Sequence, residues 1–178
     1  MTLQTTTTTV IYKWDEEQKL ESNGIVLSQA LSKDTRWAKA VVCGPDSIIE
    51  PGDKLLMSAR PTVSYFEVNG ENLMNTSDAS IMSYKRDGKL GCTKGTFLYS
   101  YIETPEEITE SGIIVVKKTT TKEFEPIKVL VEAAGPDSGV QAGDVVLLLY
   151  KNDCYKLNID GKELQNAGAE EVICLWRD

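Results

Sequence analysis

An internal repeat with a period of about 90 residues constrains this chain more than any other feature of its sequence. Three turn-forming segments of the first half recur in the second half, each 91 residues later. The pairs are Gly44-Pro45-Asp46-Ser47 with Gly135-Pro136-Asp137-Ser138, Gly52-Asp53 with Gly143-Asp144, and Asn69-Gly70 with Asp160-Gly161. Because all three share one offset, they indicate two copies of one small unit that together fill the 178 residues.

Each copy alternates short β-branched and aromatic runs with turn residues, the pattern of an all-β sandwich or barrel. The strands expected in the first copy are residues 5–14, 38–43, 54–58, 63–68 and 81–84. Those expected in the second are residues 96–103, 127–133, 144–150, 155–159 and 171–176. Asn69-Gly70 and Asp160-Gly161 lie between apolar runs and predict β-hairpins. We find no long helical pattern.

The segment between the copies, residues 86–95, holds three glycines and four charged residues. That composition is typical of a flexible connection. We therefore predict a first domain over residues 1–87, a linker over residues 88–95 and a second domain over residues 96–178.

Composition narrows the possible chemistry. The chain has no histidine, so the commonest general base and the commonest metal ligand are missing. Cys43, Cys92, Cys154 and Cys174 are widely separated, and we expect reduced, buried thiols. A net charge of −8 argues against binding to nucleic acid or to an anionic membrane, since phosphates attract a field of Lys and Arg. We expect no enzyme activity, no metal and no cofactor.

Targeting signals are not recognisable either. No run reaches the roughly 18 apolar residues of a membrane helix. The first nine residues, with threonines at positions 5–9, have neither the basic nor the apolar part of a signal peptide. We expect the protein to stay in the compartment where it is made, and we interpret the threonine run as strand.

An aliphatic triplet interrupts a long polar stretch in each copy: Ile25-Val26-Leu27 after Gly24, and Ile113-Ile114-Val115 after Gly112. One interpretation is a loop that docks on a partner, where full burial stabilises by roughly 1.5–3 kcal/mol per aliphatic side chain. The other interpretation is an ordinary core strand that follows an Asn-Gly or Ser-Gly turn.

These segments resemble the chaperonin-10 (GroES-like) co-chaperonins, whose subunits carry a Gly-Ile-Val-Leu segment on a long mobile loop. The likeness of strands and turns covers almost the whole chain twice. Thr109-Glu110-Ser111-Gly112-Ile113-Ile114 and Ala134-Gly135-Pro136-Asp137 are most similar to the co-chaperonins of T-even-like phages. Only seven residues separate Gly44 from Gly52, and seven separate Gly135 from Gly143, which resembles the reduced roof hairpin of that type.

The resemblance implies two tandem GroES-like small β-barrels with long loops and a reduced roof. It implies that Ile25, Val26, Leu27, Ile113, Ile114 and Val115 bind a chaperonin-60 ring, with Gly24 and Gly112 as loop hinges. The ATP is bound by that ring, and the client is a viral protein such as the capsid subunit. The expected location is the cytoplasm of the host cell.

The resemblance has one departure, which concerns assembly. The family's opening Pro-Leu-x-Asp-Arg-Val, a strand that helps to join neighbouring subunits, is missing from both copies. A homo-oligomer remains the expectation. Whole two-domain chains cannot supply seven barrels, whereas three chains give six and four give eight; a trimer with six barrels is one such assembly.

A second hypothesis keeps the barrels but makes the chain a virion structural protein, either a capsid-decorating or a neck component. The loops would then hold a neighbouring capsid or neck subunit permanently. Six barrels would match a six-fold capsid surface, and an edge strand such as residues 5–11 could pair across chains.

Overall fold

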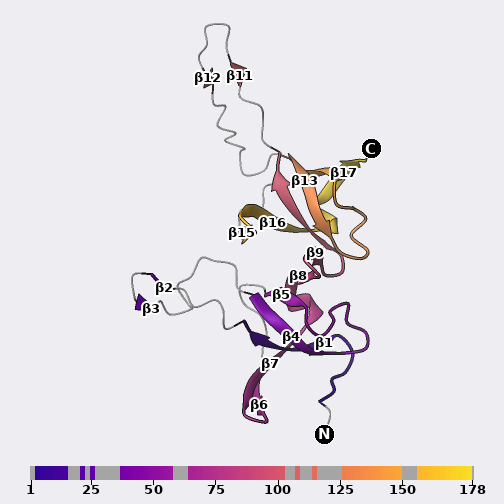
Figure 1. Ribbon diagram of the computed structural model, residues 1–178. Helices are drawn as coiled ribbons and strands as arrows, with labels where there is room; N and C mark the ends of the chain where they lie inside the picture. Colours follow the sequence, from indigo (N-terminus) through magenta and orange to yellow (C-terminus); the bar gives the residue numbers. More distant parts are fainter. Residues whose placement is uncertain are drawn as a thin grey trace.

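The computed structural model describes residues 3–15, 21–22, 25–26, 37–57, 64–102, 107–108, 114–115, 126–149 and 156–177. Within these ranges the chain is all-β, as the sequence predicts, with two large antiparallel sheets and no α-helix (Figure 1). No helix among these residues is long and apolar enough to cross a membrane.

The first sheet has seven strands in the order β6-β7-β1-β4-β5-β8-β9. Its strands are β1 (Thr9–Trp14), β4 (Trp37–Cys43), β5 (Lys54–Met57), β6 (Ser64–Val68), β7 (Glu71–Ser77), β8 (Ile81–Arg86) and β9 (Lys89–Cys92). A short 3₁₀ turn, η2 (Asp78–Ser80), joins β7 to β8.

The second sheet has six strands in the order β15-β16-β10-β13-β14-β17. Its strands are β10 (Thr96–Tyr101), β13 (Ile127–Ala134), β14 (Val145–Leu148), β15 (Leu157–Ile159), β16 (Lys162–Gly168) and β17 (Val172–Trp176). A second 3₁₀ turn, η3 (Ala169–Glu171), joins β16 to β17. The order matches that of the first sheet strand for strand, except that β9 has no equivalent among the described strands.

The repeat seen in the sequence extends to the hydrogen-bond register. A bulge in the β1–β4 pair skips Val41, and a bulge in the β10–β13 pair skips Glu132, 91 residues later. A second bulge skips Met82 opposite β5, and its counterpart skips Ile173 opposite β14, again 91 residues later. Since a slip of one residue would turn every side chain to the other face, the two copies bury equivalent positions.

The two predicted hairpins are present. Asn69 and Gly70 have φ of 53° and 80°, and Asp160 and Gly161 have φ of 52° and 80°. Positive φ at both central residues is the type I′ turn that suits the twist of paired strands. These turns lead into β7 and β16, two strands that the sequence patterns did not predict.

The prediction of a flexible connection is wrong. Asp87 and Gly88, with φ of 51° and 77°, form a third turn of the same kind, and β9 pairs with β8 beyond it. Cys92 and Thr93 are buried, so the segment is part of the packed structure. The sequence contained the Asp-Gly turn signal, but the strand after it was not predicted. It has only two apolar residues, Leu90 and Cys92, and charged residues and glycines surround them.

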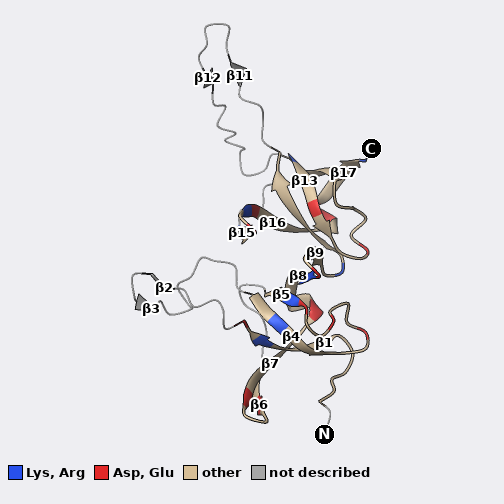
Figure 2. Cartoon of the chain, in the orientation of Figure 1, with Lys and Arg blue, Asp and Glu red and all other residues tan. Residues whose placement is uncertain are grey.

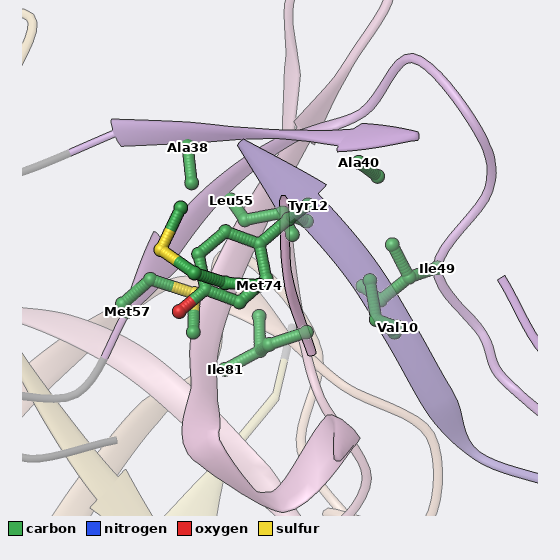
Figure 3. Close-up of a cluster of buried hydrophobic side chains, with 9 residues drawn as sticks. All are labelled: Val10, Tyr12, Ala38, Ala40, Ile49, Leu55, Met57, Met74 and Ile81. Atoms are coloured by element: carbon green, nitrogen blue, oxygen red, sulfur yellow. The ribbon is translucent and has the colours of Figure 1, made fainter. Parts of the chain in front are cut away.

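Each sheet packs its own apolar cluster. In the first copy this cluster surrounds the ring of Tyr12 (Figure 3) and consists of Val10, Tyr12, Ala38, Ala40, Ile49, Leu55, Met57, Met74 and Ile81. In the second copy it consists of Phe97, Tyr99, Ile127, Val129, Val131, Val140, Val146, Leu148 and Ala167. Among the described residues no strand pairing closes either sheet into a barrel.

A third cluster, which we call the inter-copy core, joins the two sheets. Its buried members are Leu56, Cys92, Leu98, Ala133, Leu157, Ile159 and Leu164, with Trp37, Met82 and Leu90 packed against them. Lys85 on β8 adds a hydrogen-bonded ion pair of 2.5 Å with Asp160 in the β15–β16 turn. The copies are therefore packed against each other as well as joined by the chain.

Two smaller expectations need correction. The strand predicted over residues 5–14 begins only at Thr9, because Thr7, with a φ of 49°, lies in a turn. Of the cysteines expected to be buried, Cys92 is buried, Cys43 is half-buried and Cys174 is exposed. Cys154 and the threonines at 119–121 lie outside the described residues.

Candidate functional site

The backbone of each aliphatic triplet is described in part. Ile25–Val26 forms β3, which pairs with β2 (Glu21–Ser22), and Ile114–Val115 forms β12, which pairs with β11 (Glu107–Ile108). Leu27, Ile113 and the expected hinges Gly24 and Gly112 lie outside the described residues, so their roles stay predictions.

Both pairs occupy the same place in the repeat. β2–β3 lies in the connection from β1 to β4, and β11–β12 lies in the connection from β10 to β13. Each forms a two-stranded sheet of its own and joins neither large sheet, as Figure 1 shows. The described backbone thus differs from the core-strand interpretation, in which these residues would belong to the sheets that hold the two cores.

A buried carboxylate in each copy is clamped by an arginine of the last strand region. Arg86 donates two hydrogen bonds to Asp53, at 2.9 and 2.7 Å. Arg177 donates two to Asp144, at 2.8 and 2.6 Å. The guanidinium of Arg177 holds the pKa of Asp144 below its usual range. In each copy both carboxylate oxygens already accept a hydrogen bond from the arginine. Neither Asp53 nor Asp144 is therefore placed to transfer a proton.

Glu132, the residue at the β10–β13 bulge, is also satisfied. Burial would raise its pKa, but hydrogen bonds from Lys162 at 2.6 Å and Ser100 at 2.5 Å together lower it. The carboxylate stays ionised and fully engaged, which is the behaviour of a structural ion pair.

The buried thiol of Cys92 and the half-buried thiol of Cys43 are poor nucleophiles. Burial raises the pKa of Cys92 to about 12 and is the main reason that the pKa of Cys43 lies near 11. Since the thiolate is the reactive form, both are inert near neutral pH. No cluster of His, Cys, Asp or Glu in the described part of the chain could hold a metal ion.

A cleft of about 570 Å³ lies at the junction of the two copies. It is lined by Asp15, Trp37, Gly52, Lys54, Lys85, Asp87, Gly88 and Asp160. Its lysines pair with its own aspartates, Lys54 with Asp15 at 3.5 Å and Lys85 with Asp160 at 2.5 Å. Because these side chains neutralise one another, the cleft has little net charge with which to select an ionic ligand.

Charges elsewhere on the sheets are similarly mixed. Figure 2 shows basic and acidic positions on the strands of both copies. Exposed pairs such as Lys13 with Glu71 at 3.3 Å and Lys156 with Glu163 at 2.8 Å join the two signs. This mixture is typical of a solvated surface and differs from the Lys/Arg field that phosphates require.

Sequence reasoning missed one apolar surface, on β17. Residues 171–176 were expected to form an ordinary strand, yet Ile173, Leu175 and Trp176 are 49%, 39% and 46% exposed. The ammonium of Lys128 lies 4.4 Å from the centroid of the Trp176 ring, which leaves the indole still largely accessible. The sequence signal was available in part: residues 171–176 are as apolar as a core strand, but the sequence does not show that no described strand pairs with their outer edge.

Comparison of the chain with protein-family models finds no match, and comparison with curated proteins finds none either.

Proposed function

We propose that this chain is a tandem GroES-like co-chaperonin of the phage type, which caps a chaperonin-60 ring and assists the folding of a viral protein such as the capsid subunit. One observation carries the proposal. In both copies the aliphatic segment lies in the connection between the first two strands of the sheet, and its described backbone pairs only with the segment before it. A docking loop needs this placement.

The sheets suit this role as a scaffold. Each copy surrounds its own apolar core, as a GroES-like small barrel would. The short segment between Gly44 and Gly52 turns Ile49 into the first core, where it is only 1% exposed. In the second copy the equivalent segment turns Val140 into the core, where its side chain is 6% exposed. A reduced roof of this kind closes the core with one side chain.

Energetics favour a multivalent mode of binding. Each docked aliphatic side chain contributes roughly 1.5–3 kcal/mol, while ordering the loop costs roughly 1–2 kcal/mol per residue. A single triplet therefore binds weakly. Two triplets per chain in a homo-oligomer bind together through their high effective concentration, and weak single contacts still permit release. ATP is bound by the chaperonin, and this chain contributes no cofactor.

The test is the double variant Val26→Asp with Ile114→Asp, captured on immobilised host chaperonin-60 with ATP. We expect capture to fall at least about tenfold while the circular dichroism spectrum is unchanged. Tyr65→Asp with Leu149→Asp is the matched control, because it places two acids on exposed apolar positions, one in each copy, 75% and 51% exposed. Equal capture of both double variants would contradict the proposal.

A virion structural protein is the second candidate, and the packing between the copies favours it. The inter-copy core makes the two sheets a continuous packed unit, and the apolar β17 is exposed, which suits a permanent contact. Mass spectrometry of purified particles distinguishes the candidates: the structural role requires a stoichiometric amount in the particle, and absence would end it.

A further inference from the structure

Three hairpin turns of this chain share one backbone conformation and differ in one side chain. Asn69-Gly70, Asp87-Gly88 and Asp160-Gly161 have positive φ at both residues, between 51° and 80°. Each turn is closed by the residue pair that flanks it: Val68 with Glu71, Arg86 with Lys89, and Ile159 with Lys162. Position 69 therefore carries an amide where the other two turns carry a carboxylate.

The carboxamide of Asn69 is unrestrained. The residue is exposed, and no hydrogen bond to the described residues holds its side chain. Other asparagines of the sheets are held: Asn75 accepts a hydrogen bond from the backbone N–H of Ser64 at 3.2 Å, and Asn166 donates one to the carbonyl of Phe97 at 3.4 Å. The side chain of Asn69 can therefore turn towards its own backbone.

The next backbone nitrogen, that of Gly70, is accessible. The pair Val68–Glu71 closes the strand ladder, so the turn residues lie beyond it. Gly70 is exposed, and a Cβ placed on it would meet nothing within 4 Å. Because glycine has no Cβ, no side chain crowds this nitrogen. Figure 1 shows the β6–β7 hairpin projecting from the rest of the first sheet, where solvent reaches the turn.

We propose that Asn69-Gly70 is a site of spontaneous deamidation, for which asparagine is among the chemically labile residues of proteins. The Gly70 nitrogen loses its proton to hydroxide and attacks Cγ of Asn69. A carbon–nitrogen bond forms within a five-membered succinimide, and the bond from Cγ to the amide nitrogen breaks. That nitrogen takes a proton from water and leaves as ammonia, which regenerates hydroxide. Water then opens the succinimide at either carbonyl, giving aspartate or isoaspartate.

Asn72 provides a matched reference in the same hairpin. It is exposed like Asn69, but it is followed by Leu73, which is 2% exposed and pairs with Phe66. The nitrogen that would attack Asn72 thus belongs to a packed strand residue with a bulky side chain. We expect Asn72 to keep its amide while Asn69 loses it.

The two products differ in their effect on the hairpin. Aspartate at position 69 reproduces the Asp-Gly turns at Asp87 and Asp160, so the fold is retained and one negative charge is added. Isoaspartate adds a carbon atom to the backbone, which a two-residue turn in register does not accommodate. β6 is the outermost strand and pairs only with β7 among the described strands, so it is the strand that isoaspartate releases.

The inference needs no partner and does not rest on the proposed function. Asn23-Gly24 is another Asn-Gly pair of the chain, and it lies outside the described residues. The modified position must therefore be located by peptide, because the mass of the whole chain does not distinguish the two pairs.

The experiment is peptide mapping by mass spectrometry after timed incubation of the folded full chain at neutral and mildly alkaline pH. We expect the peptide that contains Asn69 to gain the mass of an amide-to-acid conversion, faster at the higher pH, while Asn72 stays an amide. Asn69→Gln should remove the conversion at this position within the same time, because its longer side chain would have to close a six-membered ring. Asn69→Asp should keep the circular dichroism spectrum and the urea midpoint of the unmodified chain.

The unfolded chain supplies the decisive control, since incubation in urea measures the reactivity of the sequence without the turn. A folded chain that keeps the Asn69 amide while the unfolded chain converts fully would overturn the proposal, because the turn would then be protective. Equal conversion of Asn69 and Asn72 in the folded chain would overturn it too, because the geometry of the turn would then play no part.

Discussion

Strands β8 and β17 share a register, a bulge and a position in their sheets, yet one is largely covered and the other largely bare. The difference comes from β9 and the second copy, which cover β8 and have no described counterpart beside β17. Burial here is a property of the neighbours and not of the strand.

The two cores differ in a second way, at one polar network. In the second copy the hydroxyls of Tyr99 and Tyr101 donate to Oε1 of Gln165, at 2.8 and 3.0 Å. In the first copy Met74 stands at the position of Gln165, and the buried hydroxyl of Tyr12 has no hydrogen-bond partner among the described residues. Burial, with a smaller contribution from Tyr65, raises the pKa of Tyr12 to about 12. The same strand order and register therefore accommodate an apolar core in the first copy and a partly polar core in the second.

The largest expected difference between the copies is at Leu56 and Leu147. Leu56→Ala should lower the free energy of unfolding by about 3 kcal/mol, because it leaves a cavity in the inter-copy core. Leu147→Ala should cost less than about 1.5 kcal/mol in the monomer, since its side chain is already half-exposed. Urea unfolding at low protein concentration measures both. Equal costs would contradict the comparison.

A smaller difference is expected between the two buried tyrosines. Tyr99→Phe should cost about 1–2 kcal/mol, because it removes a buried hydrogen bond to Gln165. Tyr12→Phe should be neutral or slightly stabilising, because the hydroxyl it removes is buried and has no partner in the part of the chain that the structure describes. Urea unfolding measures both, with Met74→Gln as the control background. If Gln at position 74 supplies the missing acceptor, Tyr12→Phe should become costly there; a cost in the wild-type background would mean that the hydroxyl has a partner.

The smallest effect is a dependence on alkaline pH. Because the pKa of Tyr12 in the folded chain is about 12, above its ordinary value of 10, the unfolded chain loses this proton first. The contribution of Tyr12 is complete below pH 10 and declines as the pH rises towards 12. Urea midpoints between pH 9 and 11 should therefore fall less steeply for Tyr12→Phe than for the wild type. Parallel slopes would contradict the assignment.

Much of the fold follows from turn chemistry that can be recognised in the sequence. Asn69-Gly70 and Asp160-Gly161 predicted two hairpins, and the offset of 91 residues predicted two equivalent sheets; both are present. β7 and β16 were missed, because each buries only a few side chains among polar ones, Gln165 included. β9 was not predicted because its burial depends on residues of the second copy, which are distant in the sequence.

The candidate binding segments show the same division. Their place outside the large sheets was one of two interpretations that the residues left open, since an apolar triplet suits either a core strand or a docking loop. The pairing of Ile25–Val26 and Ile114–Val115 with their own flanking segments differs from the core-strand interpretation, and docking on a partner stays a prediction.

The sequence by itself determined the all-β class, the two copies and the turns, because these depend on local backbone preferences and on a repeat that can be counted. The tertiary structure alone decided which apolar strand is covered. Cover depends on contacts between residues distant in the chain, such as Cys92 against the carbonyl of Ala133 at 3.4 Å. That is why β8 and β17, both apolar in sequence, became a packed strand and an exposed one.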